Sequence, residues 1–185
     1  MTVTAVIASL GDRASLLDLL QILSSCPKVS QIILSLPPKR TISSDLLRLT
    51  ANNETIKIVH SPKKGQVAQR TYAFQQVKTE YIIQIDDDIN LLKGNFTKFL
   101  QFCLHMSSKA PRNVYAPIQC DIRLKNSKRL NYISYDLKTP RNFGLGGTYP
   151  FMLDRYGGPF FLMRSEWLPG GIVFSPKSVV NMMGV

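Results

Sequence analysis

The feature that most constrains the fold is an alternation of strand-like and helix-like segments in the first half of the chain. Short apolar, β-branched runs typical of buried parallel strands are followed by segments whose apolar residues have helical spacing. The expected strands cover residues 2–8, 29–36, 55–60 and 81–85, and the expected helices cover residues 14–25, 44–50 and 66–77. This order predicts an α/β fold with a doubly wound sheet, in which right-handed crossovers join parallel strands.

The second half of the chain has a less regular pattern of strand-like and helix-like segments. Residues 95–106 have the spacing of a further helix, and residues 114–118 and 172–174 are candidate strands. Between them the sequence is rich in glycine and basic residues and has little periodicity, which predicts hairpins or a flap. The length of 185 residues fits a single domain over residues 1–185.

Composition limits the partners and the compartment. The formal net charge of +11 indicates anionic partners: nucleic acid, an acidic membrane face or phosphorylated substrates. The three cysteines (Cys26, Cys103 and Cys120) lack metal-ligand spacing, which favours free thiols in a reducing cytosol. The sequence opens on a strand-like run without the pattern of a secretion signal, and no apolar run is long enough for a membrane span. We therefore expect a cytoplasmic protein, with peripheral contact at the inner face of the membrane left open.

Three consecutive carboxylates, Asp86, Asp87 and Asp88, follow the expected strand at residues 81–85. Ionised carboxylates are costly to bury unpaired, so they are expected at the carboxyl end of the strand, where ligands bind in open α/β sheets. Asp86 and Asp88 would point to the same side of an extended backbone. Adjacent hard oxygen ligands suit Mg²⁺ or Mn²⁺, and these ions suit a diphosphate. The alternative is an acidic turn that caps the helix beginning near Asn95.

Gly65 stands at an expected strand-to-helix turn. Glycine lets the backbone approach a ligand, and the start of a helix offers free N–H groups to an anion. Lys63, Lys64 and Arg70 add positive charge nearby. The alternative is a solvated basic turn that contains an ordinary glycine.

With these segments placed, the sequence resembles an inverting glycosyltransferase of family 2, a class with the GT-A nucleotide-sugar-binding fold. The resemblance rests on Ser9 and Asp12–Arg13 after the first strand, residues 65–70 at the helix entry, residues 81–88 as the "DxD" segment, and residues 167–171 as the loop beneath the acceptor. It implies a mostly parallel sheet flanked by helices with a loop-rich C-terminal acceptor part. Residues 1–90 would form the nucleotide-binding half, and residues 91–185 would form an incomplete acceptor-side half.

The resemblance also implies roles for individual residues. Asp88 would ligate a divalent ion, Mn²⁺ or Mg²⁺, and Asp86 would be the second residue of the metal site and face the ribose. Ser35 stands where many members carry an acid that contacts the base. The residues implied in nucleotide-sugar binding are Ala8, Ser9, Asp12, Arg13, Ser35, Gly65, Arg70, Asp86 and Asp87, and those on the acceptor side are Trp167, Gly170 and Gly171.

The catalytic carboxylate has no equivalent in the chain. In the family it lies beyond the glycine pair that corresponds to Gly170 and Gly171, and this sequence stops before that point, as a truncated or split glycosyltransferase would. Asp154 and Glu166 are the only acids after Asp136, and they remain as the candidates.

The predicted function is transfer of a sugar from a nucleoside-diphosphate sugar, with a UDP-sugar favoured, to a carbohydrate or lipid-linked acceptor in cell-surface polysaccharide synthesis. An inactive nucleotide-binding remnant is the first alternative. A nucleotidyltransferase would use a similar fold and metal. A nucleic-acid-binding module is disfavoured, because the basic residues fall mostly in loops without an RRM or helix-turn-helix pattern.

Overall fold

The structure, a computed structural model, describes residues 1–91, 93–115, 145–153, 158–165 and 171–182, with the backbone alone described for 145–153 and 158–165. The chain divides into two compact units, one of residues 1–115 with 170–185 and one of residues 116–169. In the second unit, β5 (Leu145–Leu153) and β6 (Gly158–Ser165) form an antiparallel pair. All elements considered below belong to the first unit.

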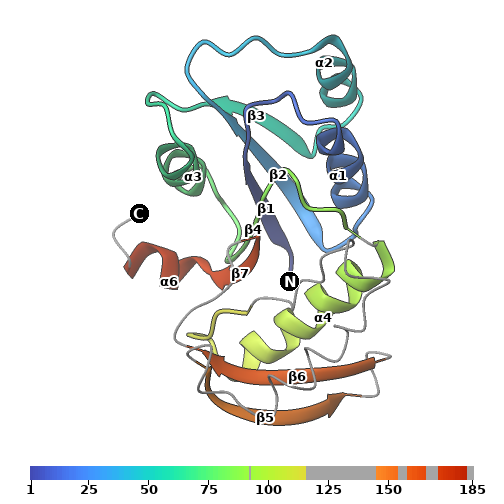
Figure 1. Cartoon of the computed structure of the whole chain (residues 1–185), viewed down its shortest axis with the longest axis vertical. Coiled ribbons are helices and arrows are strands. Elements are labelled where there is room, and N and C mark those ends of the chain that lie inside the picture. Colours follow the sequence, from blue (N-terminus) through green and yellow to red (C-terminus); the bar gives the residue numbers. More distant parts are fainter. Residues whose placement is uncertain (92, 116–144, 154–157, 166–170, 183–185) are drawn as a thin grey trace, which may run out of the picture. The chain divides into compact units, whose positions relative to one another are not determined.

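The first unit contains a five-stranded sheet of order β3-β2-β1-β4-β7 (Figure 1). Four strands are parallel: β1 (Val3–Ala8), β2 (Val29–Leu36), β3 (Ile56–His60) and β4 (Tyr81–Ile85). The edge strand β7 (Ile172–Pro176) runs antiparallel to β4. The predicted α/β class with a mostly parallel sheet is confirmed, and β2 and β4 have the predicted bounds.

Helices lie on both faces of this sheet, as a doubly wound fold requires. Figure 1 shows α1 (Ser15–Ser24) and α2 (Ser44–Ala51) on one side, and α3 (Gln66–Gln75) and α6 (Lys177–Met182) on the other. The remaining described helix, α4 (Lys93–Lys109), is longer than predicted and has no acid in its first turn. The alternative expectation was that the acidic triplet caps this helix. The helix begins at Lys93, and the triplet at residues 86–88 lies outside its first turn.

A serine side chain caps the N-terminus of α2. The residue in the cap position is Ser43, whose extended backbone (φ −67°, ψ 153°) precedes the helix and whose Oγ accepts the N–H of Leu46 at 3.3 Å. A cap residue must have non-helical dihedrals, and Ser44 and Asp45 already lie within the helix. The helix start predicted at residue 44 is confirmed, and its cap lies one residue before it.

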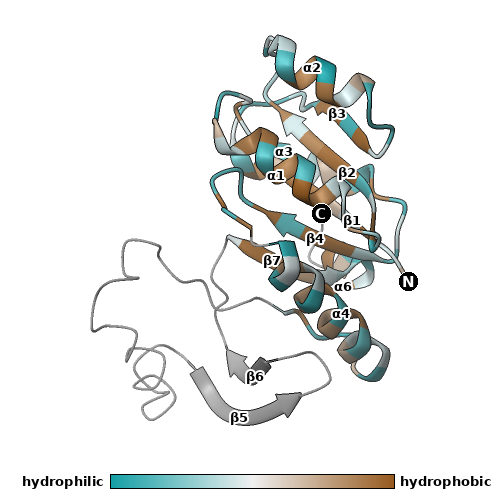
Figure 2. Cartoon of the chain, turned by 90° about the vertical axis from the view of Figure 1, so that its right-hand side faces the viewer, coloured by the Kyte–Doolittle hydropathy of each residue, from teal (hydrophilic) through white to brown (hydrophobic). Residues whose placement is uncertain are grey.

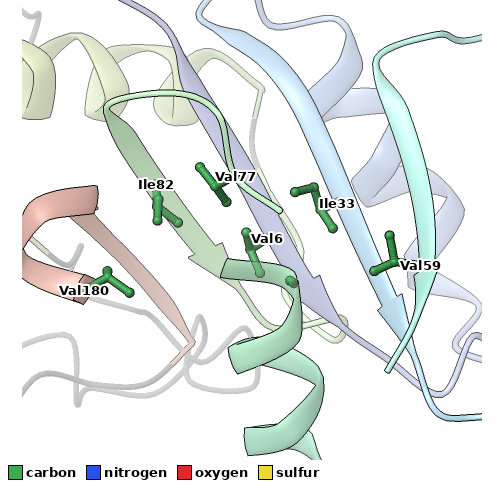
Figure 3. Close-up of a cluster of buried hydrophobic side chains, with 7 residues drawn as sticks. Val6, Ile33, Val59, Val77, Ile82 and Val180 are labelled. Carbon is green, nitrogen blue, oxygen red and sulfur yellow. The ribbon is translucent and has the colours of Figure 1, made fainter. Parts of the chain in front are cut away.

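A buried apolar cluster joins the sheet to α3 and α6. Figure 3 shows side chains from four neighbouring strands pointing into the same layer as Val77 and Val180. The strand residues in this layer are Val6, Ile33, Val59 and Ile82. The alternation of the strand turns their neighbours, such as Ile7, to the opposite face, which α1 and α2 flank. Both faces of the sheet are buried, which explains why the strands read as continuous apolar runs (Figure 2).

Aromatic contacts fix the edge strand β7. Tyr81 of β4 stacks on Phe174 of β7 with ring centroids 5.5 Å apart, and Phe174 also lies 6.3 Å from Tyr115. The backbones of Tyr115 and Phe174 exchange hydrogen bonds of 2.9 and 2.7 Å. Of the strand expected at residues 114–118, Val114 and Tyr115 are described, and Tyr115 alone forms an isolated bridge there. These contacts place the residue before β7, Gly171, beside the end of β4.

The cysteines and the helices can be compared with what the composition predicts. Cys26 and Cys103 are free and buried, whereas Cys120 lies outside the described residues. None of the helices described has the length and apolarity that a bilayer span requires.

We predict that Val6→Ala lowers the free energy of unfolding by about 2 kcal/mol, because Val6 is fully buried and the change leaves a cavity. The matched substitution Val67→Ala, at a side chain that is 77% exposed, should change it by less than about 0.5 kcal/mol. Urea denaturation measures both values. Equal effects of the two substitutions would contradict the placement of Val6 in the core.

Candidate functional site

A groove of about 590 Å³ lies at the carboxyl ends of β1 and β2, within the size range of small-molecule sites. Three loops and one acid line it. The lining residues are Ala8, Ser9, Leu10 and Arg13 after β1, Pro37, Pro38, Lys39 and Arg40 after β2, Lys64, Gly65, Gln66 and Gln69 around the start of α3, and Asp87 after β4. Ligands in open α/β sheets bind at this edge, as the sequence predicts.

The groove is electropositive. Its lining includes four cationic side chains, those of Arg13, Lys39, Arg40 and Lys64, against the single carboxylate of Asp87. A concave surface lined mainly by one sign of charge concentrates ligands of the opposite sign. The geometry therefore favours an anionic ligand.

The acidic triplet forms a turn in place of the expected extended backbone. The strand β4 ends at Ile85, and the N–H of Asp86 donates to the carbonyl of Gly171 at 2.8 Å. The N–H of Ile89 then donates to the carbonyl of Asp86 at 3.3 Å, which closes a turn over Asp87 and Asp88. The extended backbone expected for residues 86–88 is therefore wrong, because the strand ends at Ile85.

Asp86 pairs with the guanidinium of Arg70 on α3, through Nη2 and Oδ1. Burial raises the pKa of Asp86; the positive charge of Arg70 opposes this effect, and the neighbouring Asp88 and Asp87 add to it. The Nε atom of Arg70 is buried and has no hydrogen-bond partner in the described part of the chain. Arg70 is thus directed at the acidic turn and partly offsets the cost of burying Asp86.

Asp87 is held by the loop after β1. Ser9 Oγ donates to Asp87 Oδ2 at 2.5 Å, and Arg13 Nε lies 3.8 Å from Asp87 Oδ1. Ser15 Oγ donates to the main-chain carbonyl of Asp87 at 3.0 Å. These contacts attach the acidic turn to the β1–α1 loop and point the Asp87 carboxylate into the groove.

Asp88 is exposed and has no hydrogen bond or ion pair to the residues that the structure describes. Within those residues no group of three or more His, Cys, Asp or Glu side chains could enclose a metal ion. Mg²⁺ and related ions are commonly held by one or two carboxylates together with substrate phosphates and water. The free carboxylate of Asp88, with Asp86 two residues before it, fits that type of site.

Arg40 forms one wall of the groove and was not found from the sequence. Its Nε donates to the carbonyl of Leu10 at 2.7 Å, and its Nη2 lies 3.0 Å from Asp12 Oδ2. His60 Nε2 contacts the carbonyl of Arg40 at 3.0 Å. Asp12, an expected nucleotide-binding residue, is thus engaged by Arg40 and is absent from the groove lining.

Gly65 occupies the position that demands glycine. Its φ of 107° lies in the region that side chains rarely adopt, and it begins α3 without a side-chain cap. Gly65 and Gln66 both line the groove, so the N-terminus of α3 opens onto it. The expected backbone turn and its basic surroundings are found together at the groove.

Gln69 also lines the groove, and it lies in the helix-entry segment of residues 65–70, where no individual role was predicted for it. It is 4% exposed, and its amide nitrogen donates to the carbonyls of Ser9 at 2.8 Å and Ser35 at 2.6 Å. Ser35 itself is fully buried and does not line the groove, and its Oγ has no partner among the described residues. Its carbonyl, not its hydroxyl, therefore takes part in building the site.

The acceptor-side and catalytic candidates fall mostly outside the part of the chain that the structure describes. Gly171 is described and accepts the N–H of Asp86. Asp154, Glu166, Trp167 and Gly170 lie outside the described residues.

We predict that Gly65→Ala lowers the free energy of unfolding by about 1 to 3 kcal/mol, because alanine is strained at this φ. A Cβ at Gly65 would have no atom within 4 Å, so a clash would not contribute. Gly94→Ala is the matched control: it lies in α4 with equally open space and should raise stability by about 0.5 kcal/mol. Thermal and urea unfolding test the opposite signs, and a stabilising Gly65→Ala would contradict this account.

Comparison with known proteins identifies the family. The family model described as "Glycosyl transferase family 64 domain" matches residues 3–104. No curated protein matches the chain by sequence.

Solved structures with a similar fold include three that contain a nucleotide or a nucleotide-sugar. TarS 1–349 of S. aureus in complex with UDP has a TM-score of 0.63 at 10% identity, over 100% of this chain and 49% of TarS. Glucosyl-3-phosphoglycerate synthase of Mycobacterium tuberculosis, with Mn²⁺, UDP-glucose and phosphoglyceric acid, has a TM-score of 0.57 at 10% identity, over 96% and 57%. A CMP:2-keto-3-deoxy-manno-octonic acid synthetase complexed with CTP has a TM-score of 0.54 at 9% identity, over 100% and 78%.

The chain spans about half the length of the TarS structure that it matches. The expected GT-A-type glycosyltransferase fold is confirmed. The matching model is that of family 64, whereas the sequence motifs resemble family 2, so the residue roles carried over from family 2 stay predictions. Because the family model covers more than half of the 185 residues, this chain belongs to the glycosyltransferases with a family 64 domain.

Proposed function

We propose that the protein binds a nucleoside-diphosphate sugar, with a UDP-sugar favoured, and transfers the sugar to a carbohydrate or lipid-linked acceptor. The observation that carries the proposal is the groove at the ends of β1 and β2, which is lined by four cationic side chains and by the carboxylate of Asp87. The similar folds of TarS in complex with UDP and of glucosyl-3-phosphoglycerate synthase with UDP-glucose support UDP as the nucleotide.

The charges around the groove fit a diphosphate. Arg13, Arg40 and Lys64 reach the lining from three different loops, so an anion between them would contact positive charge from several sides. The free N–H groups at the start of α3, beside Gly65, add a further favourable interaction with phosphate. Leu10, Pro37 and Pro38 supply an apolar part of the lining, which suits a planar base.

A divalent ion, Mn²⁺ or Mg²⁺, completes the proposed site. Asp88 would hold the ion directly, with Asp86 as the second carboxylate. When bound, the ion would neutralise negative charge on the departing nucleoside diphosphate. The free carboxylate of Asp88 and the Mn²⁺ present in the glucosyl-3-phosphoglycerate synthase structure support this assignment.

The acceptor and the site of action are proposed from the charge of the chain. The net charge of +11 favours an anionic lipid-linked acceptor and peripheral contact with an acidic membrane face. We propose a role in cell-surface polysaccharide synthesis on that basis. Asp154 and Glu166 remain the candidates for the catalytic carboxylate, and Trp167 and Gly170 remain acceptor-side candidates.

Nucleotidyl transfer is the second candidate function. The similarity to the CTP-bound synthetase favours it, since that enzyme shares the fold over the whole of this chain. The product separates the two reactions: a glycosyltransferase releases a nucleoside diphosphate, whereas a nucleotidyltransferase acting on a nucleoside triphosphate releases pyrophosphate. The family 64 match makes glycosyl transfer the leading proposal.

We predict that UDP binds more tightly with Mn²⁺ than without it, and that Asp88→Ala removes the metal-dependent part of the affinity. Isothermal titration measures UDP and GDP binding with and without Mn²⁺. Asp18→Ala, which removes an exposed carboxylate on α1, is the control and should leave the affinity unchanged.

The outcomes distinguish the competing functions. Absence of UDP and GDP binding in the wild-type protein, with metal and without, would overturn the proposed site. Binding without turnover of any UDP-sugar would identify an inactive nucleotide-binding remnant. Binding of RNA or DNA with a steep salt dependence, in place of UDP, would identify a nucleic-acid-binding module.

We predict that Lys64→Ala weakens UDP binding about two- to fivefold at low salt, because an exposed cation at the groove contributes a modest, screened attraction. The difference should shrink at about 1 M salt, where the Debye length is about 3 Å. Lys98→Ala on α4 removes the same charge away from the groove and should have no such effect. Equal losses for the two variants would show that only net charge matters.

A further inference from the structure

We propose that Gln69 is a positioning residue of the nucleotide site: it holds Ser9, and Ser9 fixes the direction of the Asp87 carboxylate in the groove. This inference rests on the proposed function, because the nucleoside diphosphate is the ligand that responds to the position of Asp87. It assigns a role to a buried side chain of the helix-entry segment, residues 65–70, for which no individual role was predicted from the sequence.

Gln69 acts where the regular ladder between β1 and β2 stops. The last paired residues are Ala8 and Ser35, so Ser9 lies one residue beyond β1. The N–H of Ser9 still donates to the carbonyl of Ser35 at 3.0 Å. The carbonyl of Ser9 has no strand partner and instead accepts a hydrogen bond from Gln69 Nε2 at 2.8 Å. The second N–H of the same amide donates to Ser35 at 2.6 Å, which ties the two strand ends together.

Ser9 links the hydrogen bond from Gln69 to the carboxylate of Asp87. Its Oγ accepts the N–H of Gly11 at 2.9 Å and donates to Asp87 Oδ2 at 2.5 Å. A hydroxyl has a single proton, so acceptance from Gly11 leaves that proton for Asp87. A change in the backbone of Ser9 would therefore move or release the Asp87 carboxylate.

Glutamine suits the position because one amide nitrogen supplies two donors for two carbonyls. Methionine has a similar length and no donor, and glutamate would place a carboxylate against two carbonyl oxygens. The N–H of Gln69 donates to the carbonyl of Gly65 at 3.0 Å, so the entry turn of α3 sets where the side chain points. The next residue, Arg70, pairs directly with Asp86, whereas Gln69 acts on Asp87 only through Ser9.

A double-mutant cycle tests the proposal. UDP affinity in the presence of Mg²⁺ is measured by isothermal titration for wild type, Gln69→Met, Ser9→Ala and the double variant. We expect Gln69→Met to weaken binding about tenfold, because the variant loses both hydrogen bonds that hold the ends of β1 and β2. The double variant should bind no more weakly than the weaker single variant, because both substitutions break the same chain of contacts.

Two controls separate positioning from a general loss of stability. Gln75→Met changes an exposed glutamine of the same helix and should leave UDP affinity unchanged. Gln69→Met combined with Lys64→Ala should show additive losses, since Lys64 is not part of the chain of contacts. Thermal unfolding of each variant confirms that the folded protein is being titrated.

Unchanged affinity in Gln69→Met, or additivity with Ser9→Ala, would overturn the role of Gln69 while leaving the nucleotide site intact. Failure of wild type to bind UDP would overturn the proposed function instead. If Gln69→Met does not fold, NMR of wild type decides: the side-chain amide signals of Gln69 should shift saturably with UDP and Mg²⁺, and those of Gln75 should not. Unshifted Gln69 signals would overturn the proposal.

Discussion

The site depends on the position of β1 in the sheet, between β2 on one side and β4 on the other. All three strands are parallel, so their carboxyl ends and the loops that follow meet at one edge. The chain leaves β1 toward β2 and later returns to the other side of β1 with β4, and this reversal opens a crevice at the strand ends. Ser9 follows β1 and Asp87 follows β4, and their hydrogen bond spans the position of that reversal.

The three acids of the triplet differ in their contacts and in their exposure to solvent. Asp86 is partly buried against Arg70, Asp87 is held by Ser9, and Asp88 is exposed. Three identical ionised carboxylates in succession would repel one another, and the cation and the hydroxyl reduce that repulsion at two of them. The third is left with its oxygen atoms available to a ligand. Identical residues thus acquire different roles through contacts with other elements.

The first turns of α3 connect the two sides of the groove. Gly65 permits the abrupt entry from the basic loop, Gln69 holds the ends of β1 and β2, and Arg70 holds the turn after β4. Buried polar side chains with complete hydrogen bonds give rigidity and direction to their surroundings. The apolar cluster beneath, with Val6 and Ile82, anchors the same strands from the side of the sheet on which α3 lies. Packing and polar contacts therefore support the groove together.

The strands and helices could be predicted from the sequence, because each is a local pattern: β2 and β4 have the predicted bounds, and the acids follow β4 as expected. The sequence also located the glycine turn at the start of α3. The side-chain contacts of the site could not be predicted, because the partners are far apart in the chain. Ser9 and Asp87 are separated by 78 residues, Gln69 and Ser9 by 60 residues, and Arg40 and Asp12 by 28 residues. The acids also form a turn and not the expected extended backbone, because β4 ends just before Asp86, whose N–H donates to the carbonyl of Gly171. Such contacts depend on how strand ends are brought together in space, which no short-range pattern encodes.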